Sequence, residues 1–495
     1  MDNVTQRRSI KRILIVAIGI SIFCLTTPAK GQDATAKPNI IFIMVDQMRP
    51  DHLIGPTTPN LSTLSEEGVR FIHNYTASPL CQPSRISIIT GLYPSQTKIY
   101  GNQTGPLSDE LRDNTFMNEL QKAGYYTGFI GKHHYIDRYA TGTNMIQADA
   151  DEIKKYGFDY VVQVADIGEH IPNSNHSENV DDYIYYLRKK GLEKTYFDKI
   201  TSGIRSGIHP LKSEDTEDGF IGLTARDFID NYNKDAPFYL SVSFIGPHPP
   251  YVVPEEFIST KPEDTVAPIG SINNDATRLK RARYKDMISQ LDFYVGKIVK
   301  SLKERGFSDN TVIIFTADHG DNLGDYGIWD KRYFYEQSAG VPLFISGKGI
   351  PGKDIRIGDI QSKALVSSLD IYPTIMNLAG VDISDRKLPG KNLLNIIKGN
   401  NEDLRGAVFS QLGTLVMIRT ARWKMVFDPE EGGTYYLFNL INDPKELNNL
   451  AGVAGYEAIT ADLTKKLLSF YIGLDQSTQM KEQLRLQKVR VGTMN

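Results

Sequence analysis

The chain has 495 residues, of which 40% are hydrophobic, and this length allows one large domain and a smaller one, each with its own core. Its 59 acidic and 56 basic residues give a formal net charge of −3 at pH 7, which provides no overall attraction to nucleic acid or to an anionic membrane. Any recognition of an anion must therefore come from a local cluster of charges, and no nucleic-acid partner is expected.

The first predicted element is an export signal. Four basic residues between positions 7 and 12 precede an apolar run, 13–25, which small and polar residues follow. This order is typical of a secretory signal peptide, which we expect to occupy residues 1–31. The apolar run is shorter than the roughly 20 residues of a spanning helix, so a membrane anchor is the weaker alternative and stable membrane insertion is not expected. We expect an exported bacterial protein, periplasmic or extracellular.

Short apolar runs predict buried strands, each followed by polar residues, at 40–45, 126–130, 238–244 and 312–316. Helix-period segments separate them, which is the pattern of a mostly parallel sheet covered by helices. We therefore predict an α/β main domain over residues 38–390, with a large mostly parallel sheet flanked by helices. The polar stretch 137–220 interrupts the pattern and is interpreted as a variable insertion.

Polar side chains come directly after these strands. In an open α/β sheet, ligands bind beyond the carboxyl ends of the strands, so groups that are distant in sequence can meet there. The groups concerned are Asp46 and Gln47, Lys132 and His134, His248, and Asp318 and His319.

Cys81 is the only cysteine left once the signal peptide is removed, which excludes an internal disulfide. The segment from Cys81 to Arg85 opens a predicted helix, because Pro83 suits a first turn and Gly91 suits a helix end. The unsatisfied amides at a helix N-terminus favour an anion, so a nucleophile and an oxyanion substrate could share this place. A small buried hydrophobe is the alternative interpretation of a lone cysteine.

The end of the chain has a different pattern. After a short helix at 392–397, four short runs predict an antiparallel sheet, at 408–411, 415–419, 423–427 and 435–438. A last helix over 458–471 would cover this sheet. We therefore predict a smaller C-terminal subdomain over residues 400–495.

The sequence Cys81-x-Pro83-Ser84-Arg85, followed by Thr90-Gly91, resembles the signature of type I, formylglycine-dependent sulfatases, which have an alkaline-phosphatase-like fold. The segment from Thr58 to Phe71 also resembles the helix that precedes this signature in the family. Ile89 and Leu92 depart from the family's usual Leu and Arg, but both lie outside the signature's centre. The resemblance runs from about residue 39 to the C-terminus and matches 137–220 poorly.

The resemblance implies that a separate maturation enzyme oxidises Cys81 to formylglycine. Water would attack the sulfate ester of a simple alcohol only slowly, whereas the hydrate of an aldehyde has a second hydroxyl that can expel sulfate by C–O cleavage. The nucleophile would therefore regenerate itself.

The resemblance also implies a divalent metal held by Asp46, Gln47, Asp318 and His319 together with the modified Cys81. Calcium is the first choice, and the imidazole and amide leave manganese, magnesium and zinc open. Taken singly, each carboxylate is equally a turn former or a helix cap.

Other matches to family segments imply the groups that bind sulfate and move protons. Lys132, in Gly-Lys-x-His, would clamp sulfate, and His134 would be the base that assists release of sulfate from the nucleophile. His248, in Pro-His-x-Pro, would contact sulfate or protonate the leaving oxygen. Lys331 would be both clamp and proton donor, and Arg85 would add a fixed positive charge on the transferred group. Structural or solvated roles are the alternative for each.

Gln47 stands where the family more often has Asp. This Asp-Gln pair, together with Asn102 as a substrate-binding residue, is similar to the branch that holds choline-sulfatases and phosphonate monoester hydrolases. Export favours a sulfated carbohydrate as the substrate. The alternatives are a phosphonate or phosphodiester hydrolase with the same machinery, and a non-catalytic glycan-binding protein that kept only the fold.

Overall fold

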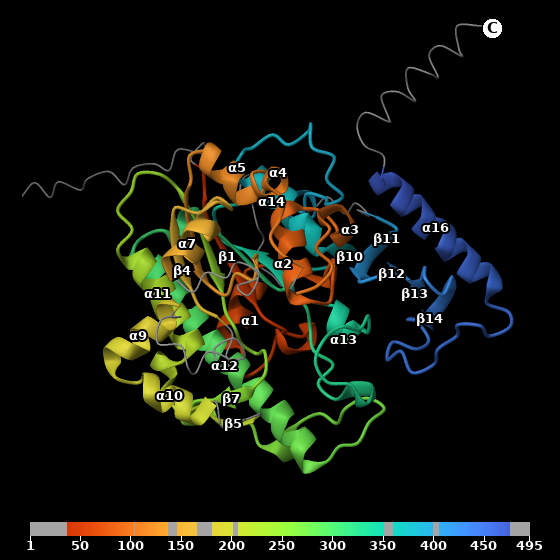
Figure 1. The fold of residues 1–495 in the computed structure, drawn as a ribbon, viewed down its shortest axis with the longest axis horizontal. Coiled ribbons are helices and arrows are strands. Elements are labelled where there is room, and N and C mark those ends of the chain that lie inside the picture. The colour runs from red at the N-terminus through yellow and green to blue at the C-terminus, as the bar shows by residue number, and fades with distance from the viewer. Residues whose placement is uncertain are drawn as a thin grey trace, which may run out of the picture. The chain divides into compact units, whose positions relative to one another are not determined.

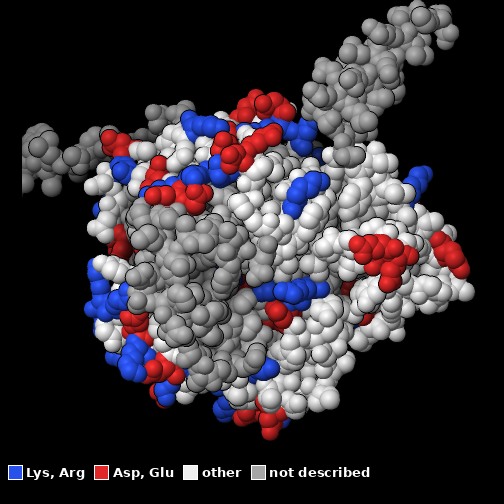
Figure 2. Space-filling view, viewed as in Figure 1, with Lys and Arg blue, Asp and Glu red and all other residues white. Residues whose placement is uncertain are grey.

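The computed structural model describes residues 37–102, 104–136, 146–165, 181–200, 206–350, 360–398 and 405–475. The predicted signal peptide and about a third of the predicted insertion, 137–145, 166–180 and 201–205, lie outside these residues. Within them, no helix is both long enough and apolar enough to cross a membrane. Acidic and basic side chains intermingle over the described part of the face shown in Figure 2.

The main sheet has eight strands in the order β10-β2-β9-β8-β1-β6-β3-β4. Every neighbouring pair is parallel except the two that involve β9, which runs antiparallel to β2 and β8. The strands are β1 (Asn39–Val45), β2 (Gly68–Tyr75), β3 (Tyr126–Gly131), β4 (Tyr160–Gln163), β6 (Phe238–Ser243), β8 (Thr311–Ala317), β9 (Leu343–Ser346) and β10 (Ile360–Ser367). The four strands predicted from apolar runs, which are β1, β3, β6 and β8, are confirmed.

Helices cover both faces of this sheet (Figure 1). Successive side chains of a strand point to opposite faces, so Ile41 and Ile43 enter one core while Phe42 and Met44 enter the other. The first core packs against α1 (Pro59–Glu66), α11 (Glu217–Asp230) and α12 (Asp275–Glu304), and the second against α2 (Cys81–Thr90), α5 (Phe116–Lys122) and α14 (Ile371–Leu378). Burial on both faces explains why these strands are continuous apolar runs.

The predicted C-terminal antiparallel sheet is also present, in the order β11 (Ala407–Leu412), β12 (Leu415–Thr420), β13 (Trp423–Asp428) and β14 (Gly433–Asn439). Leu463 and Leu467 of α16 (Glu457–Asp475) pack on one face of it. The other face packs against Tyr75 and Phe334 of the main body. The predicted fold class is thereby confirmed.

The remaining elements are short. Tyr183, which lies in the predicted insertion, is fully buried and donates a hydrogen bond to the carbonyl of Asp215, so it belongs to the core. The remaining helices and strands are α3 (Pro94–Thr97), α4 (Asp109–Arg112), α7 (Ile146–Lys154), α9 (Asp182–Lys190), α10 (Glu193–Ile200), α13 (Glu336–Ala339), α15 (Leu394–Ile397), β5 (Ser206–Ile208) and β7 (Tyr251–Val253).

Candidate active site

Cys81 is the first residue of α2, as predicted. Leu80 before it is extended, and Gly91 ends the helix in the left-handed region with a φ of 69°, which glycine adopts without strain. Every residue of α2 is buried, so the helix N-terminus opens into the protein and not into solvent. The Cys81 side chain is 1% exposed.

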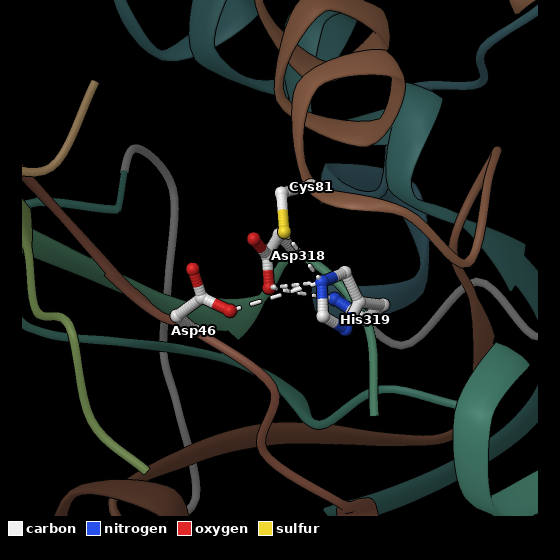
Figure 3. Close-up of side chains that lie close together, drawn as sticks. All are labelled: Asp46, Cys81, Asp318 and His319. Carbon is white, nitrogen blue, oxygen red and sulfur yellow. Dashed lines mark hydrogen bonds and ion pairs between the residues drawn. The ribbon is translucent and has the colours of Figure 1, made fainter. Parts of the chain in front are cut away.

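The neighbouring strands β1 and β8 are paired in parallel through Val45 and Ala317, so the residues after them leave the same edge of the sheet. Asp46 follows β1, and Asp318 and His319 follow β8. One ligand atom from each of these residues and Cys81 Sγ all lie within 4.8 Å of one another, and all four residues are buried. Figure 3 shows the four side chains pointing toward one another.

This cluster has the electrostatic character of a cation site. Oδ1 of Asp46 is buried, has no hydrogen-bond partner among the described residues and lies 3.7 Å from His319 Nε2. His319 Nε2 lies 3.2 Å from Cys81 Sγ, and its Nδ1 lies 3.0 Å from the carbonyl oxygen of Gly320. Burial lowers the pKa of His319, but Asp318 and the Cys81 thiol outweigh burial and raise it to about 9. The surroundings therefore favour positive charge at this point.

Gln47 borders the same cluster and is fully buried. Its φ is 72°, an uncommon conformation for a residue with a side chain. Its backbone amide donates to Asp318 Oδ1 at 3.1 Å, and its Oε1 accepts a hydrogen bond from Lys331 Nζ at 2.9 Å. Asp46, Gln47, Asp318 and His319 are thus brought together, as the hypothesis of a metal site requires.

Arg85 lies beneath the carboxylates. Its guanidinium makes four hydrogen bonds, to Asp318 Oδ2 at 2.8 Å, Asp46 Oδ2 at 3.1 Å, the Lys132 carbonyl at 2.7 Å and Ser243 Oγ at 2.9 Å. The sequence-based expectation was a charge on the transferred group. In the structure the fully buried guanidinium bonds to the two carboxylates, and its action on the transferred group stays a prediction.

Lysines and a histidine surround Asp46. Lys132 Nζ is 2.6 Å from Asp46 Oδ2. Burial raises the pKa of Asp46, but Lys132, His248, Arg85 and Lys331 outweigh burial and hold it well below its usual range. His248 follows β6 in a turn with cis peptide bonds before Pro247 and Pro250, and its Nδ1 lies 2.8 Å from the Pro249 carbonyl oxygen. These basic side chains gather around the carboxylates next to Cys81.

The sequence predicts two further members of the site, Asn102 and His134. Asn102 Oδ1 accepts a hydrogen bond at 3.0 Å from the amide of Gln82, so this side chain lies at the first turn of α2, next to Cys81. His134 is half-buried, has a φ of 52°, and its buried Nδ1 has no hydrogen-bond partner among the described residues. Within the described residues, neither side chain makes a hydrogen bond to Asp46, Cys81, Asp318 or His319.

Comparison of the sequence with known proteins shows the family of the chain. The family model named Sulfatase matches residues 38–381, a span that includes Asp46, Cys81, Asp318 and His319. The chain belongs to the sulfatase family. It is therefore a hydrolase of sulfate esters. A second model, N-sulphoglucosamine sulphohydrolase, C-terminal, matches residues 324–472.

This sulfatase is similar to both kinds of enzyme in the predicted branch. The choline-sulfatase of Rhizobium meliloti (strain 1021) is 32% identical over 463 residues, which cover 84% of this chain and 83% of the relative. The crystal structure of the phosphonate monoester hydrolase of Agrobacterium radiobacter covers 88% of this chain and 96% of that chain, with a TM-score of 0.73 and 24% identity. BT4656, solved in complex with its substrate D-glucosamine-2-N,6-O-disulfate, covers 89% and 99%, with a TM-score of 0.65 and 19% identity.

Several residues that support the site were not predicted. Ser84 Oγ donates to the carbonyl of Asp318 at 2.6 Å, and Ser243 Oγ accepts from Arg85. Asp321 accepts a hydrogen bond from Gln47. Ser84 could have been found, because it lies within the signature itself. The contacts of Ser243 with Arg85 and of Asp321 with Gln47 join residues more than 150 positions apart, so no local sequence pattern predicts them.

Asp218 holds the turn that carries His248. Its carboxylate accepts hydrogen bonds from the amides of Ile245 and Gly246, at 2.8 and 3.0 Å. Burial raises its pKa from 3.8 to about 7, although these amides act in the opposite direction. Between these two pH values the folded sulfatase retains a proton that the unfolded chain has released, so its stability should fall as the pH rises through this window.

We expect the variant Asp218→Asn, which cannot ionise, to lack this pH dependence. The wild-type free energy of unfolding should fall relative to that of the variant by about 1.4 kcal/mol per pH unit between the two values. Urea unfolding at a series of pH values measures this difference. Asp227→Asn, on the same helix but at a side chain that is 57% exposed, is the control and should run parallel to wild type. Parallel curves for Asp218→Asn as well would contradict the prediction.

The C-terminal sheet holds the segment that contains Lys331. Lys424 of β13 is fully buried, donates to the Phe334 carbonyl at 2.9 Å, and pairs with Glu336 at 2.5 Å and Glu446 at 2.7 Å. The other side of the segment is fixed where the amide of Arg332 donates to the carbonyl of Pro79, two residues before Cys81. Lys331 is thus held between the α2 N-terminus and the C-terminal sheet.

We expect Lys424→Met to destabilise the sulfatase by about 3–5 kcal/mol, because it leaves the buried carboxylate of Glu446 and the half-buried one of Glu336 without their cation. Thermal or urea unfolding measures this cost. Lys466→Met is the control, because that lysine is 49% exposed and pairs with Asp462 on the surface of α16, where an ion pair contributes about 0–1 kcal/mol. Equal stability of the two variants would show that the buried network does not hold the segment.

Proposed function

We propose that this sulfatase is exported and hydrolyses sulfate esters of carbohydrates, with formylglycine at position 81 and a divalent cation held by Asp46, Gln47, Asp318 and His319. The observation that carries the proposal is the buried cluster of ligand atoms within 4.8 Å of one another, in which the Cys81 side chain is a member. A nucleophile and an electrophilic cation would thus share one water-poor site.

The chemistry of these residues suits a hard divalent cation. Two carboxylates and an amide oxygen are oxygen donors, and Oδ1 of Asp46 is an acceptor with no hydrogen-bond partner among the described residues. Calcium is our first choice, and the imidazole of His319 also suits manganese, magnesium or zinc. When bound, the cation would polarise the sulfate group and lower the pKa of the attacking hydroxyl.

The chain's own residues would do the remaining work. Lys132 and Lys331, both nearly buried, would bind the sulfate oxygens, and burial strengthens such contacts by excluding water. His248 would give a proton to the leaving oxygen, because a sugar alkoxide leaves poorly without one. His134 would accept the proton that must leave the nucleophile when sulfate is released. Formylglycine, formed by a maturation enzyme, would supply a hydrate with two hydroxyls.

A carbohydrate substrate is supported by the predicted export signal and by one structural neighbour. An export signal would bring the enzyme to extracellular polymers, and BT4656 shares the fold and binds a disulfated glucosamine. A phosphonate or phosphodiester substrate is the second candidate, because Gln47 removes one negative charge from the site and the phosphonate monoester hydrolase has the same fold.

Parallel assays on 4-nitrophenyl sulfate and 4-nitrophenyl phenylphosphonate separate these candidates. The protein should be purified from a host that contains the maturation enzyme, and its cation content should be defined. We expect faster turnover of the sulfate, and release of sulfate from at least one of a panel of defined sulfated saccharides. Faster turnover of the phosphonate would favour the second candidate. Binding of sulfated saccharides without release of sulfate would favour a non-catalytic glycan-binding protein.

A further inference from the structure

Asp321 is a buried carboxylate that contacts donors only. Its Oδ2 accepts hydrogen bonds from Gln47 Nε2 and from the Tyr251 hydroxyl, both at 2.8 Å. Its Oδ1 accepts from the backbone amides of Leu323 at 2.8 Å and Asp330 at 3.1 Å. Each oxygen thus has two donors, and Asp321 is absent from the group of ligand atoms around Asp46.

These contacts determine which end of the Gln47 amide faces the site. In the observed orientation the NH2 group points to Asp321 and Oε1 points to Lys331 Nζ. In the reversed orientation, the amide oxygen would lie against the carboxylate of Asp321 and the NH2 group against the ammonium of Lys331. Both contacts would be repulsive, so reversal is opposed at both ends of the amide.

We propose that Asp321 is a positioning residue that fixes the Gln47 amide with its oxygen toward the cation. This inference rests on the proposed function, because it takes Gln47 to be a ligand of the cation. The same geometry explains why position 47 is an amide in this chain. A carboxylate there would have an oxygen about 2.8 Å from that of Asp321, and two like charges at this distance in a buried place are strongly unfavourable.

Asp321 also connects Gln47 to Lys331, the lysine proposed to bind sulfate. The carboxylate of Asp321 accepts a hydrogen bond from the backbone amide of Asp330. Asp330 directly precedes Lys331, whose Nζ donates to Gln47 Oε1. Three hydrogen bonds and the backbone between Asp330 and Lys331 thus join Asp321, Gln47 and Lys331 in one ring. A role limited to bracing the loop would need only the two backbone amides. The two roles are distinguished by reversing the polarity of the contact with Gln47.

The test measures Ca²⁺ and Mn²⁺ affinity by isothermal titration calorimetry on cation-free protein, together with thermal unfolding in EDTA. Asp321→Asn presents an NH2 group to Gln47 and should weaken affinity about 10- to 100-fold, the usual effect of losing a residue that orients a ligand. Gln47→Glu alone should be at least as damaging, because it opposes two carboxylates. The double variant Gln47→Glu with Asp321→Asn restores a donor-acceptor pair, and its affinity should recover to near the wild-type value.

Tyr251→Phe is the matched control, because it removes one donor to Asp321 without reversing the contact with Gln47. Its affinity should change far less than that of Asp321→Asn. The proposal is overturned if Asp321→Asn is less stable in EDTA but binds the cations as tightly as wild type, or if the double variant binds no better than Asp321→Asn. A wild-type protein that binds neither cation would instead refute the metal site itself.

Discussion

Replacing Cys81 with alanine should abolish hydrolysis of sulfate esters and leave the fold intact. Removing a nucleophile typically lowers turnover by roughly 10⁴-fold or more, because no other group can form the covalent bond. The Cys81 side chain points into the polar cluster and contributes little to either hydrophobic core. Initial rates on 4-nitrophenyl sulfate, compared with the unfolding temperature of the same sample, separate loss of chemistry from loss of structure.

Cys81→Ser distinguishes a modified cysteine from a simple alcohol nucleophile. Serine has one hydroxyl, so it can accept the sulfuryl group but cannot expel sulfate by C–O cleavage. The variant should therefore release one equivalent of 4-nitrophenol and then stop, and intact-mass spectrometry should find a sulfate ester at position 81. Sustained turnover by either variant would contradict the proposed nucleophile. So would peptide mass spectra of the wild type, from its own host, that show only a thiol at this position.

The central strands could be predicted because their signal is local. In β1 and β8 every residue is buried, so each reads as a continuous apolar run that polar residues end. The direction of β9 has no such signal. Its four residues, Leu343–Ser346, are as apolar as those of a parallel strand, yet it runs antiparallel between β2 and β8. That direction depends on how the chain returns to the sheet, which the strand's own residues do not encode.

The same distinction applies to the site. Asp46 and Asp318 could be placed together because each directly follows a central strand, and the carboxyl ends of neighbouring parallel strands meet at one edge. The target of Arg85 could not be predicted in this way. Its helix position shows that it lies one turn from Cys81, but a carboxylate and a sulfate are equally good partners for a guanidinium. The choice depends on Asp46 and Asp318, which approach it from other parts of the chain.

Replacing Asp46 with asparagine should remove cation binding and destabilise the cation-free protein. Oδ2 of Asp46 accepts from Lys132 at 2.6 Å and from Arg85 at 3.1 Å, whereas Oδ1 has no hydrogen-bond partner in the described part of the chain and lies 3.7 Å from His319 Nε2. An asparagine that keeps the contacts of Oδ2 turns its NH2 group toward the cation site. The opposite orientation turns that NH2 group toward two buried cations. Either way a buried charge loses its partner, which typically costs about 3–5 kcal/mol.

The decisive measurement is the stabilisation that calcium gives to each protein. A ligand at 1,000 times its dissociation constant stabilises the folded state by about 4 kcal/mol, and wild type should show a shift of this kind over EDTA. Asp46→Asn should show almost none. Asp309→Asn, at a side chain that is 66% exposed and pairs with Lys348, is the control and should respond like wild type. An Asp46→Asn variant that gains as much from calcium as wild type would place the cation elsewhere, because Asp46 would then contribute no ligand to it.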